Sequence, residues 1–302
     1  MLKQISVYHV DAFTERPFAG NPAGVIPDAG SLTVTQMQQV ANELNLPESA
    51  FLLPPVDPQA DYRIRYFTPQ EEINFCGHAT VGSSWLLAAK YGWTEKAKPI
   101  VFETNVGLIP VTIGSSGDSF GGVTMTQVSP KVSEIHVEHA EIAELLGIPA
   151  GQLDTRFPVK LASTGNWHLI VPVKTHAAID AARPDLAQLA AHNKKHGIST
   201  THLFTFDGKP GFDLYTRDFA PAIGIAEDPV TGAANGALAG YLILENILGR
   251  QETHNLIIGQ GDAIGRPGTL YVTIEPTDSD AVIKVGGFAH VTLEGVLRLG
   301  DS

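Results

Sequence analysis

Three polar residues are candidates for proton-transfer chemistry. Glu48 lies in NLPESAF, between a predicted helix end and an apolar run, where partial burial could raise its pKa toward the range useful for a general acid or base. His78 follows Cys76 at a predicted helix start and could donate to a carboxylate or shuttle a proton. Asp228 precedes Pro229 in EDPVTGAA. Structural interpretations compete: a solvated carboxylate for Glu48, a core histidine for His78 and a helix cap for Asp228.

Cys76 is the only cysteine in the chain, so it cannot form an internal disulfide. At a helix N-terminus the dipole would favour its thiolate, as in reactive cysteines, although a single cysteine is often a buried hydrophobe. A racemase that uses two thiols would need a second cysteine. A symmetric two-thiol mechanism is therefore not expected.

Two other sets of residues have weaker chemical interpretations. His136 and His139 are only two potential metal ligands, whereas a closed site usually needs three or four, so we expect no metal. Arg217 and Asp218 in YTRDFAP could orient a substrate carboxylate and shape a loop, or could form a structural salt bridge.

Two segments about half the chain apart resemble each other: CGHATVGSSWLLAA from Cys76 and TGAANGALAGYLIL from Thr231. Each combines small residues with large apolar ones and predicts a helix buried on every side. We therefore expect two similar domains, each with strands around a central helix. The first backbone N–H groups of these helices, at 77–79 and 232–234, could together bind an anionic substrate.

Hydrophobic periodicity predicts the elements around these helices. Thr33 and Gln36 have the spacing of a capping box, and apolar residues then recur at helical spacing up to a stop at Asn45 and Pro47. The segment PFAGNPAGV, with Asn21 at its centre, predicts a loop. Further helices are predicted at 138–146 and 186–195, and strands at 5–13, 50–53, 62–67, 108–113, 160–162, 168–173, 203–205, 270–274 and 282–285.

Composition narrows the class of protein. Strands outnumber helices, which favours a mixed α+β fold over repeated βαβ units, and GQGDAIGRPG precedes a strand and lacks the spacing of a dinucleotide loop. The net charge of -12 opposes binding to nucleic acid and anionic membranes. The chain shows neither a leader peptide nor a run of about eighteen apolar residues, so we expect a soluble cytoplasmic protein.

Taken together and in order, the motifs resemble those of the phenazine-biosynthesis PhzF-like isomerases: VDAFTERPFAGNPAGV, LPESAF, RYFTP, CGHAT, TGNWHLIVPV, RDFAPAIGIAEDPVTGAANG and QGDAIGRPG. The resemblance implies a diaminopimelate-epimerase-like fold of two pseudo-symmetric domains, each a barrel-like, mostly antiparallel sheet around a central helix. We place the domains at 1–120, completed by 287–302, and at 121–286, with the active site in the cleft between them. The resemblance also implies no cofactor and a homodimer.

The resemblance assigns catalytic roles to Glu48, His78 and Asp228. The residues expected to bind substrate are Asn21, Cys76, Gly77, Ala79, Gly165, Thr231, Gly232 and Ala233. Two positions depart from the pattern of the phenazine enzyme, which usually has a serine where Ala233 stands and carries no thiol at Cys76. The position of Cys76 resembles the first catalytic cysteine of the related epimerases and racemases, whose second cysteine corresponds to Thr231.

We therefore expect an isomerase that moves a proton on a small carboxylate substrate, similar to dihydro-hydroxyanthranilate isomerase, with Glu48 as general acid and base. Two alternatives stay open. One is an amino-acid epimerase or racemase that uses Cys76. The other is an inactive protein that only binds small carboxylates, because a shared fold does not establish activity.

Overall fold

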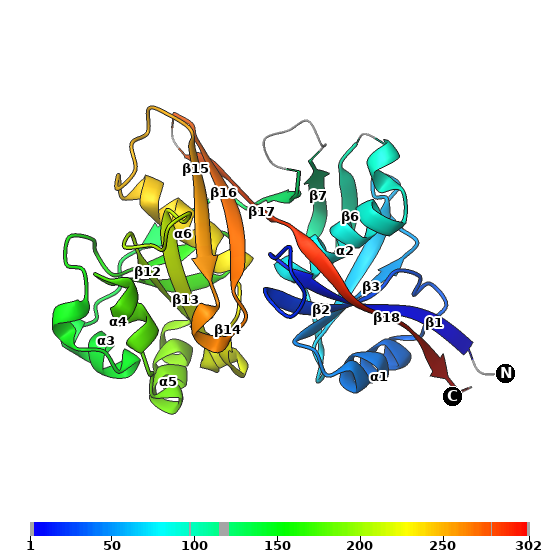
Figure 1. Cartoon of the computed structure of the whole chain (residues 1–302), viewed down its shortest axis with the longest axis horizontal. Helices are drawn as coiled ribbons and strands as arrows, with labels where there is room; N and C mark the ends of the chain where they lie inside the picture. The colour runs from blue at the N-terminus through cyan, green and yellow to red at the C-terminus, as the bar shows by residue number, and fades with distance from the viewer. Residues whose placement is uncertain (1–2, 97, 115–120, 279, 301–302) are drawn as a thin grey trace. The chain divides into compact units, whose positions relative to one another are not determined.

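The computed structural model describes residues 3–96, 98–114, 121–278 and 280–300, and the chain divides into two compact units (Figure 1). Unit 1 comprises Met1–Met125 with Gly286–Ser302, and unit 2 comprises Thr126–Val285. Both boundaries fall inside strands, β8 (Val123–Thr126) and β17 (Ala281–Gly287). The domain boundary predicted at residue 120 falls in the segment 115–120, which lies outside the described residues.

Unit 1 is built on a mostly antiparallel sheet. Its strands are β1 (Lys3–Ala12), β2 (Asn21–Ile26), β3 (Glu48–Leu53), β4 (Tyr62–Phe67), β5 (Glu72–Ile73), β6 (Ile100–Thr104), β7 (Gly107–Ile113) and β18 (Ala289–Leu299). Neighbours pair in the order β18, β1, β2, β3, β4, β6 and β7, with only the β2–β3 and β4–β6 pairs parallel among these. The short β5 adds to β4.

Two helices pack on this sheet. α1 (Val34–Leu44) has the predicted capping box, in which Thr33 and Gln36 bond each other's backbone N–H, and it ends at Asn45 in the left-handed conformation. α2 (Gly77–Lys90) contacts β1, β2, β3, β7 and β18, and most of its residues up to Leu87 are buried. α2 is therefore the central helix of unit 1. A 3₁₀ turn, η1 (Trp93–Lys96), follows it.

Unit 2 repeats this plan. Its strands are β9 (Lys131–Ser133), β10 (Lys160–Ser163), β11 (Trp167–Pro172), β12 (Thr200–Thr205), β13 (Leu214–Ala220), β14 (Ile225–Asp228), β15 (His254–Gln260) and β16 (Gly268–Pro276). Its helices are α3 (His139–Leu146), α4 (His176–Ala181), α5 (Leu186–His196) and α6 (Gly232–Leu244), with 3₁₀ turns η2 (Ala150–Gln152), η3 (Pro221–Ile223) and η4 (Asp262–Ile264). α6 contacts β9, β10, β11 and β16 and is buried from Ala234 to Ile243, so it is the central helix.

The two units share one order of strand pairing. In unit 2, neighbouring strands pair in the order β9, β10, β11, β12, β13, β15 and β16. Only the β11–β12 and β13–β15 pairs are parallel among these. They occupy the same places in the order as the parallel pairs β2–β3 and β4–β6 of unit 1. When the β2–β3 pair of unit 1 is matched with the β11–β12 pair of unit 2, Glu48, the first residue of β3, corresponds to Thr200, the first residue of β12. Cys76 and Thr231 occupy the same N-cap position of α2 and α6. The predicted mixed α+β fold of two similar halves is therefore confirmed.

The prediction of a loop for PFAGNPAGV is wrong from Asn21 onward. Asn21–Ile26 forms β2, is fully buried, and lies between β1 and β3. Proline and glycine suggested a turn, but tertiary packing requires the glycine here. A Cβ on Gly24 would lie 2.7 Å from Ser49 Oγ and 3.0 Å from Leu44 Cδ1, so only glycine lets β2 pass this close to α1 and β3.

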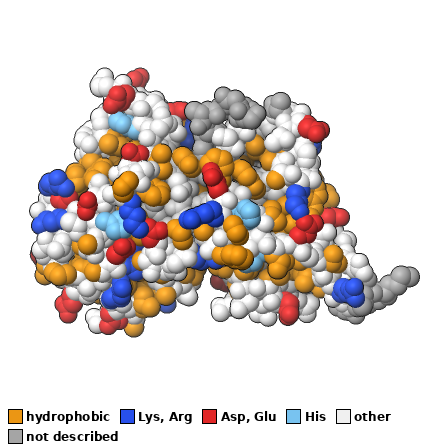
Figure 2. Space-filling view, in the orientation of Figure 1, with side chains coloured by type: hydrophobic (Ala, Val, Ile, Leu, Met, Phe, Trp, Pro, Cys, Tyr) orange, Lys and Arg blue, Asp and Glu red, His pale blue; other side chains and the backbone are white. Residues whose placement is uncertain are grey.

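The surface carries charges of both signs. Figure 2 shows acidic and basic side chains interspersed on the face in view. Ion pairs such as Lys98–Asp61 in unit 1 and Lys284–Glu275 in unit 2 are partly or well exposed, and pairs of this kind contribute only about 0–1 kcal/mol each. Within the described part of the chain, no helix has both the length and the apolar character needed to span a membrane.

We expect Gly240→Ala to destabilise unit 2, although alanine normally stabilises a helix interior by about 0.5–1 kcal/mol relative to glycine. A Cβ on Gly240 would lie 2.4 Å from the Pro130 Cβ, so the central helix would have to shift. Overpacking of this kind costs about 1–3 kcal/mol, measurable by urea unfolding. Gly151→Ala, in the exposed η2 with nothing within 4 Å, serves as control. A higher unfolding midpoint for Gly240→Ala would contradict this packing.

Candidate active site

Glu48 and His78 meet in unit 1, as the sequence motifs predict. The Glu48 Oε2 and His78 Nε2 atoms lie 3.1 Å apart, and the two side chains are 12% and 10% exposed. Burial alone would lower the pKa of His78, but the adjacent Glu48 carboxylate favours its protonated form and raises the pKa well above its ordinary value. The pair is thus mostly enclosed yet retains some solvent access, a setting suited to proton transfer.

Cys76 completes the cluster. Its Sγ lies 3.5 Å from His78 Nδ1 and 3.8 Å from Nε2. The residue is buried, and burial raises the pKa of the Cys76 thiol, which the neighbouring imidazole only partly offsets. Burial of the sulphur thus opposes the thiolate that a helix N-terminus favours.

Backbone elements hold these side chains in register. Glu48 opens β3 and pairs in parallel with Ala23 of β2. On α2, the Thr80 hydroxyl donates to the Cys76 carbonyl (2.7 Å) and lies 2.6 Å from the buried Tyr66 hydroxyl on β4. Side-chain hydrogen bonds thus fix the first turn of α2 against the sheet, which positions His78.

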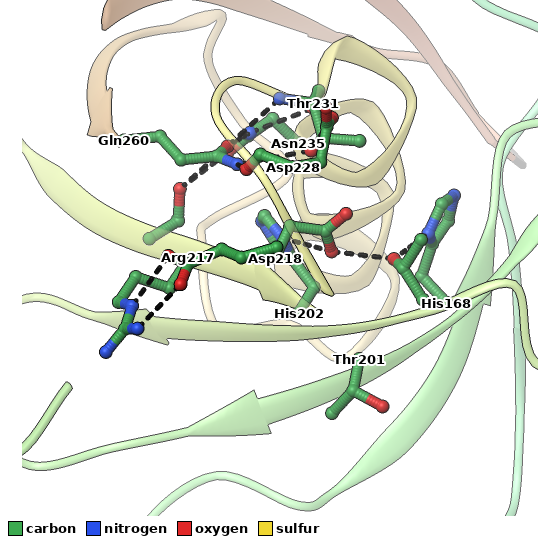
Figure 3. A network of polar contacts seen from close by, with 12 residues as sticks. His168, Thr201, His202, Arg217, Asp218, Asp228, Thr231, Asn235 and Gln260 are labelled. Atoms are coloured by element: carbon green, nitrogen blue, oxygen red, sulfur yellow. Dashed lines mark hydrogen bonds and ion pairs between the residues drawn. The ribbon is translucent and has the colours of Figure 1, made fainter. Parts of the chain in front are cut away.

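The start of α6 has a second polar cluster (Figure 3). The Thr231 hydroxyl donates to the Asp228 carboxylate, and Gln260 Nε2 donates to the Asp228 carbonyl at 3.0 Å. Gln260 Oε1 accepts from the Thr231 N–H (3.2 Å) and from Asn235 Nδ2 (2.8 Å). Gln260 is not among the site residues predicted from the sequence, although it opens the motif QGDAIGRPG. The N-cap of α6 is Thr231, so the interpretation of Asp228 as the cap is wrong.

Neither central helix is capped by its N-cap side chain. Cys76 and Thr231 both adopt extended backbone angles and make no side-chain capping bond. The N–H groups of Gly77 in unit 1 and of Gly232 and Ala233 in unit 2 therefore keep the anion-binding potential of a helix N-terminus, whereas the Ala79 N–H faces the Cys76 sulphur.

A third cluster, which sequence reasoning missed, lies on β11, β12 and β13 (Figure 3). The Thr200 hydroxyl donates to Asp218 Oδ1 (2.6 Å), and His168 Nδ1 lies 2.8 Å from that hydroxyl. His202 Nδ1 lies 3.0 Å from the same carboxylate oxygen. All four residues are buried. Burial opposes the charge of Asp218, but His202 holds the pKa of this carboxyl below its ordinary value.

Because this cluster contains buried histidines, we expect the free energy of unfolding to depend on pH. Burial lowers the pKa of His168 from 6.5 to about 4, so the unfolded chain binds more protons between those values. Stability should fall as the pH drops from 6.5 to 4, by about 3 kcal/mol from this residue. His168→Asn should remove this part of the slope in urea unfolding at several pH values, whereas the exposed His139→Asn should keep it. An unchanged slope in His168→Asn would contradict the assignment.

Arg217 has a structural role. It lies on β13, not in a loop, with its guanidinium paired to Glu227 (Nε 2.8 Å, Nη2 2.7 Å) and Nη1 donating to the Ile179 and Ala182 carbonyls at 2.7 and 3.1 Å. The group is 4% exposed. Of the two interpretations left open by the sequence, the structure supports the salt bridge, and Asp218 belongs to the histidine cluster instead.

The other predicted site residues have varied positions. Asn21 is buried at the start of β2, and Gly165 is exposed between β10 and β11 with φ +139°. The side chain of its neighbour Thr164 lies 3.4 Å from the Ala233 carbonyl, which places this turn beside the start of α6. His136 and His139 are both exposed.

Residues 10–295 match the phenazine biosynthesis-like protein family, and the chain belongs to it. A crystal structure of a PhzF-family protein of Bacillus anthracis has TM-score 0.87 and 31% identity, covering 98% of this chain and 99% of that one. A hydroxyproline epimerase from Agrobacterium vitis shares the fold alone, with TM-score 0.63 and 13% identity over 99% and 93% of the chains.

Curated relatives carry the same activity class. The uncharacterized isomerase YddE of Escherichia coli K12 is 39% identical over 90% of this chain and 91% of its own length. The trans-2,3-dihydro-3-hydroxyanthranilate isomerase of Pseudomonas aeruginosa is 31% identical over 95% and 96% of the two chains. The predicted family and the predicted enzyme class, an isomerase, are confirmed.

Proposed function

We propose that this protein is a cofactor-independent isomerase that moves a proton between two atoms of a small carboxylate substrate, with Glu48 as general acid and base. The observation that carries the proposal is the enclosed contact between Glu48 and His78, 3.1 Å apart. A carboxylate in this setting can remove a proton from carbon, hold it as a carboxylic acid, and return it to another atom of the same substrate. Protons and electrons balance without an external oxidant or base.

The neighbouring groups have supporting roles in this proposal. His78, whose pKa is raised by its neighbours, would bond the ionised form of Glu48 and hold its orientation. Backbone N–H groups at the start of α2 would bind the substrate carboxylate. Asp228, just before α6 in unit 2, is proposed as a catalytic residue on the motif resemblance alone. Asn21 and Gly165 are proposed to bind substrate on the motif resemblance alone.

The substrate class follows from one relative. The Pseudomonas aeruginosa enzyme acts, by its name, on a dihydro-hydroxyanthranilate. Ala233 and Cys76 depart from the motif that the phenazine enzyme usually carries, so we propose a related small carboxylate and not that same compound. We also propose a homodimer, which light scattering of the purified protein would test.

Screening aromatic and amino-acid carboxylates by thermal shift, followed by proton exchange in D2O, tests this function. A true substrate should raise the melting temperature and acquire deuterium at carbon. No exchange with any carboxylate that binds would instead support a protein that only binds. Alkylation of Cys76 tests the alternative of an epimerase that uses this thiol as its base. Full proton exchange after alkylation would eliminate that alternative. Burial of Cys76 and a threonine at the second thiol position both favour Glu48 over that alternative.

A further inference from the structure

The cluster of Glu48, Cys76 and His78 contains three different metal-ligand types. One donor atom from each residue, a carboxylate oxygen, a thiol sulphur and an imidazole nitrogen, can be chosen so that all lie within 4.8 Å of one another. We propose that this cluster binds Zn²⁺ as an inhibitory site, in which the metal occupies the proposed catalytic carboxylate. The expectation of no metal rests on His136 and His139 alone, which lie outside this cluster.

The donor spacing suits zinc. Tetrahedral Zn²⁺ with bonds of about 2.0–2.3 Å places its ligand atoms about 3.3–3.6 Å apart. Here Glu48 Oε2 lies 3.1 Å from His78 Nε2, and Cys76 Sγ lies 3.8 Å from the same nitrogen. These two distances lie within about 0.5 Å of the zinc values, and the third pair of donors lies within 4.8 Å. Three protein ligands leave a fourth position for water, as in zinc sites that exchange ligands.

The charges of the site also suit zinc. A carboxylate and a thiolate neutralise Zn²⁺, while imidazole remains uncharged, so the occupied cluster has no net charge, which matters for a largely buried site. On binding, the proton of the Cys76 thiol and the proton of the His78 imidazolium would both pass to solvent. Glu48 and His78 retain 12% and 10% exposure, which leaves a route for the ion.

The duplicated half provides an internal comparison. The positions in unit 2 that correspond to Glu48, Cys76 and His78 are Thr200, Thr231 and Ala233, which lack a carboxylate, thiol and imidazole. Among the described residues, the cluster in unit 1 alone brings three such donors together. The proposed zinc site is therefore specific to one half of the fold.

Metal titration of the purified, metal-free protein tests the site without any substrate. Wild type should bind one equivalent of Zn²⁺, and Co²⁺ at the same site should show the near-ultraviolet absorption of a cobalt–thiolate bond. Loss of an outer-shell partner alone costs about 10–100-fold in metal affinity, so Cys76→Ser and His78→Gln should weaken binding at least about 100-fold. His139→Gln, which replaces an exposed histidine, should bind as wild type does.

A second measurement needs no variant. Zn²⁺ should slow alkylation of Cys76 in the wild-type protein, and a chelator should restore the rate. Zinc binding without a thiolate signal, or alkylation unaffected by zinc, would overturn the proposal. The inhibitory effect itself rests on the proposed function: Zn²⁺ should stop proton exchange reversibly. Binding with unimpaired exchange would overturn the inhibitory role, whereas absent exchange in metal-free protein would count against the proposed function only.

Discussion

Turnover should fall by about 10²–10⁴-fold when Glu48 is replaced by glutamine, while KM changes little. Glutamine keeps the size of the side chain and can still accept a hydrogen bond from His78, 3.1 Å from the present carboxylate. It cannot accept a proton from carbon at neutral pH. Because the binding groups remain in place, the loss should appear in kcat. Steady-state kinetics on a ligand found by thermal shift would measure both constants.

The matched control is Glu43→Gln, which replaces an exposed carboxylate of α1 in the same unit. This variant should keep wild-type kcat and KM. A Glu48→Gln enzyme with turnover within about twofold of wild type would remove Glu48 from the chemistry. A large rise in KM at constant kcat would instead indicate that Glu48 binds the substrate without transferring a proton.

Replacement of Arg217 by methionine should reduce the free energy of unfolding by about 3–5 kcal/mol. The substitution leaves the Glu227 carboxylate, which is 10% exposed, without its guanidinium partner. It also removes the donor to the Ile179 and Ala182 carbonyls at the end of α4. An uncompensated buried charge is costly to keep, and methionine cannot bond those carbonyls. Urea unfolding followed by circular dichroism would measure the change.

Arg63→Met is the comparison for this prediction. Arg63 is 37% exposed and its Nε lies 3.8 Å from Glu103, so its loss should cost less than about 1 kcal/mol. Equal stabilities of the two variants would refute a structural role for Arg217. Reduced substrate affinity with wild-type stability in Arg217→Met would restore the hypothesis that this residue orients a substrate carboxylate.

Local signals in the sequence predicted the helices whose ends and buried faces are determined by residues close together in the chain. The capping box of Thr33 and Gln36 and the stop at Asn45 set both ends of α1. The similar small and apolar segments from Cys76 and Thr231 identified two buried central helices with matching N-caps. These features depend on neighbours within a few residues, which periodicity and capping rules capture.

Long-range contacts produced what the sequence missed. β2 resembles a loop in composition and becomes a strand because β1 and β3 flank it. β13 was not foreseen, and its Asp218 joins His168, Thr200 and His202 only because three strands lie side by side. The contact of Glu48 with His78 was suggested by motif order. Its distance depends on the pairing of β2 with β3 and on the packing of α2, which no single segment encodes.

Deuterium incorporation from D2O, compared between wild type and Glu48→Gln with the same saturating carboxylate, tests the central claim most directly. The proposed mechanism predicts carbon-bound deuterium in the wild-type reaction and almost none with Glu48→Gln, although both proteins bind the ligand equally in thermal shift. Equal incorporation by the two proteins would show that another group moves the proton. Loss of incorporation on alkylation of Cys76 alone, with Glu48→Gln still active, would transfer the role of base to the thiol.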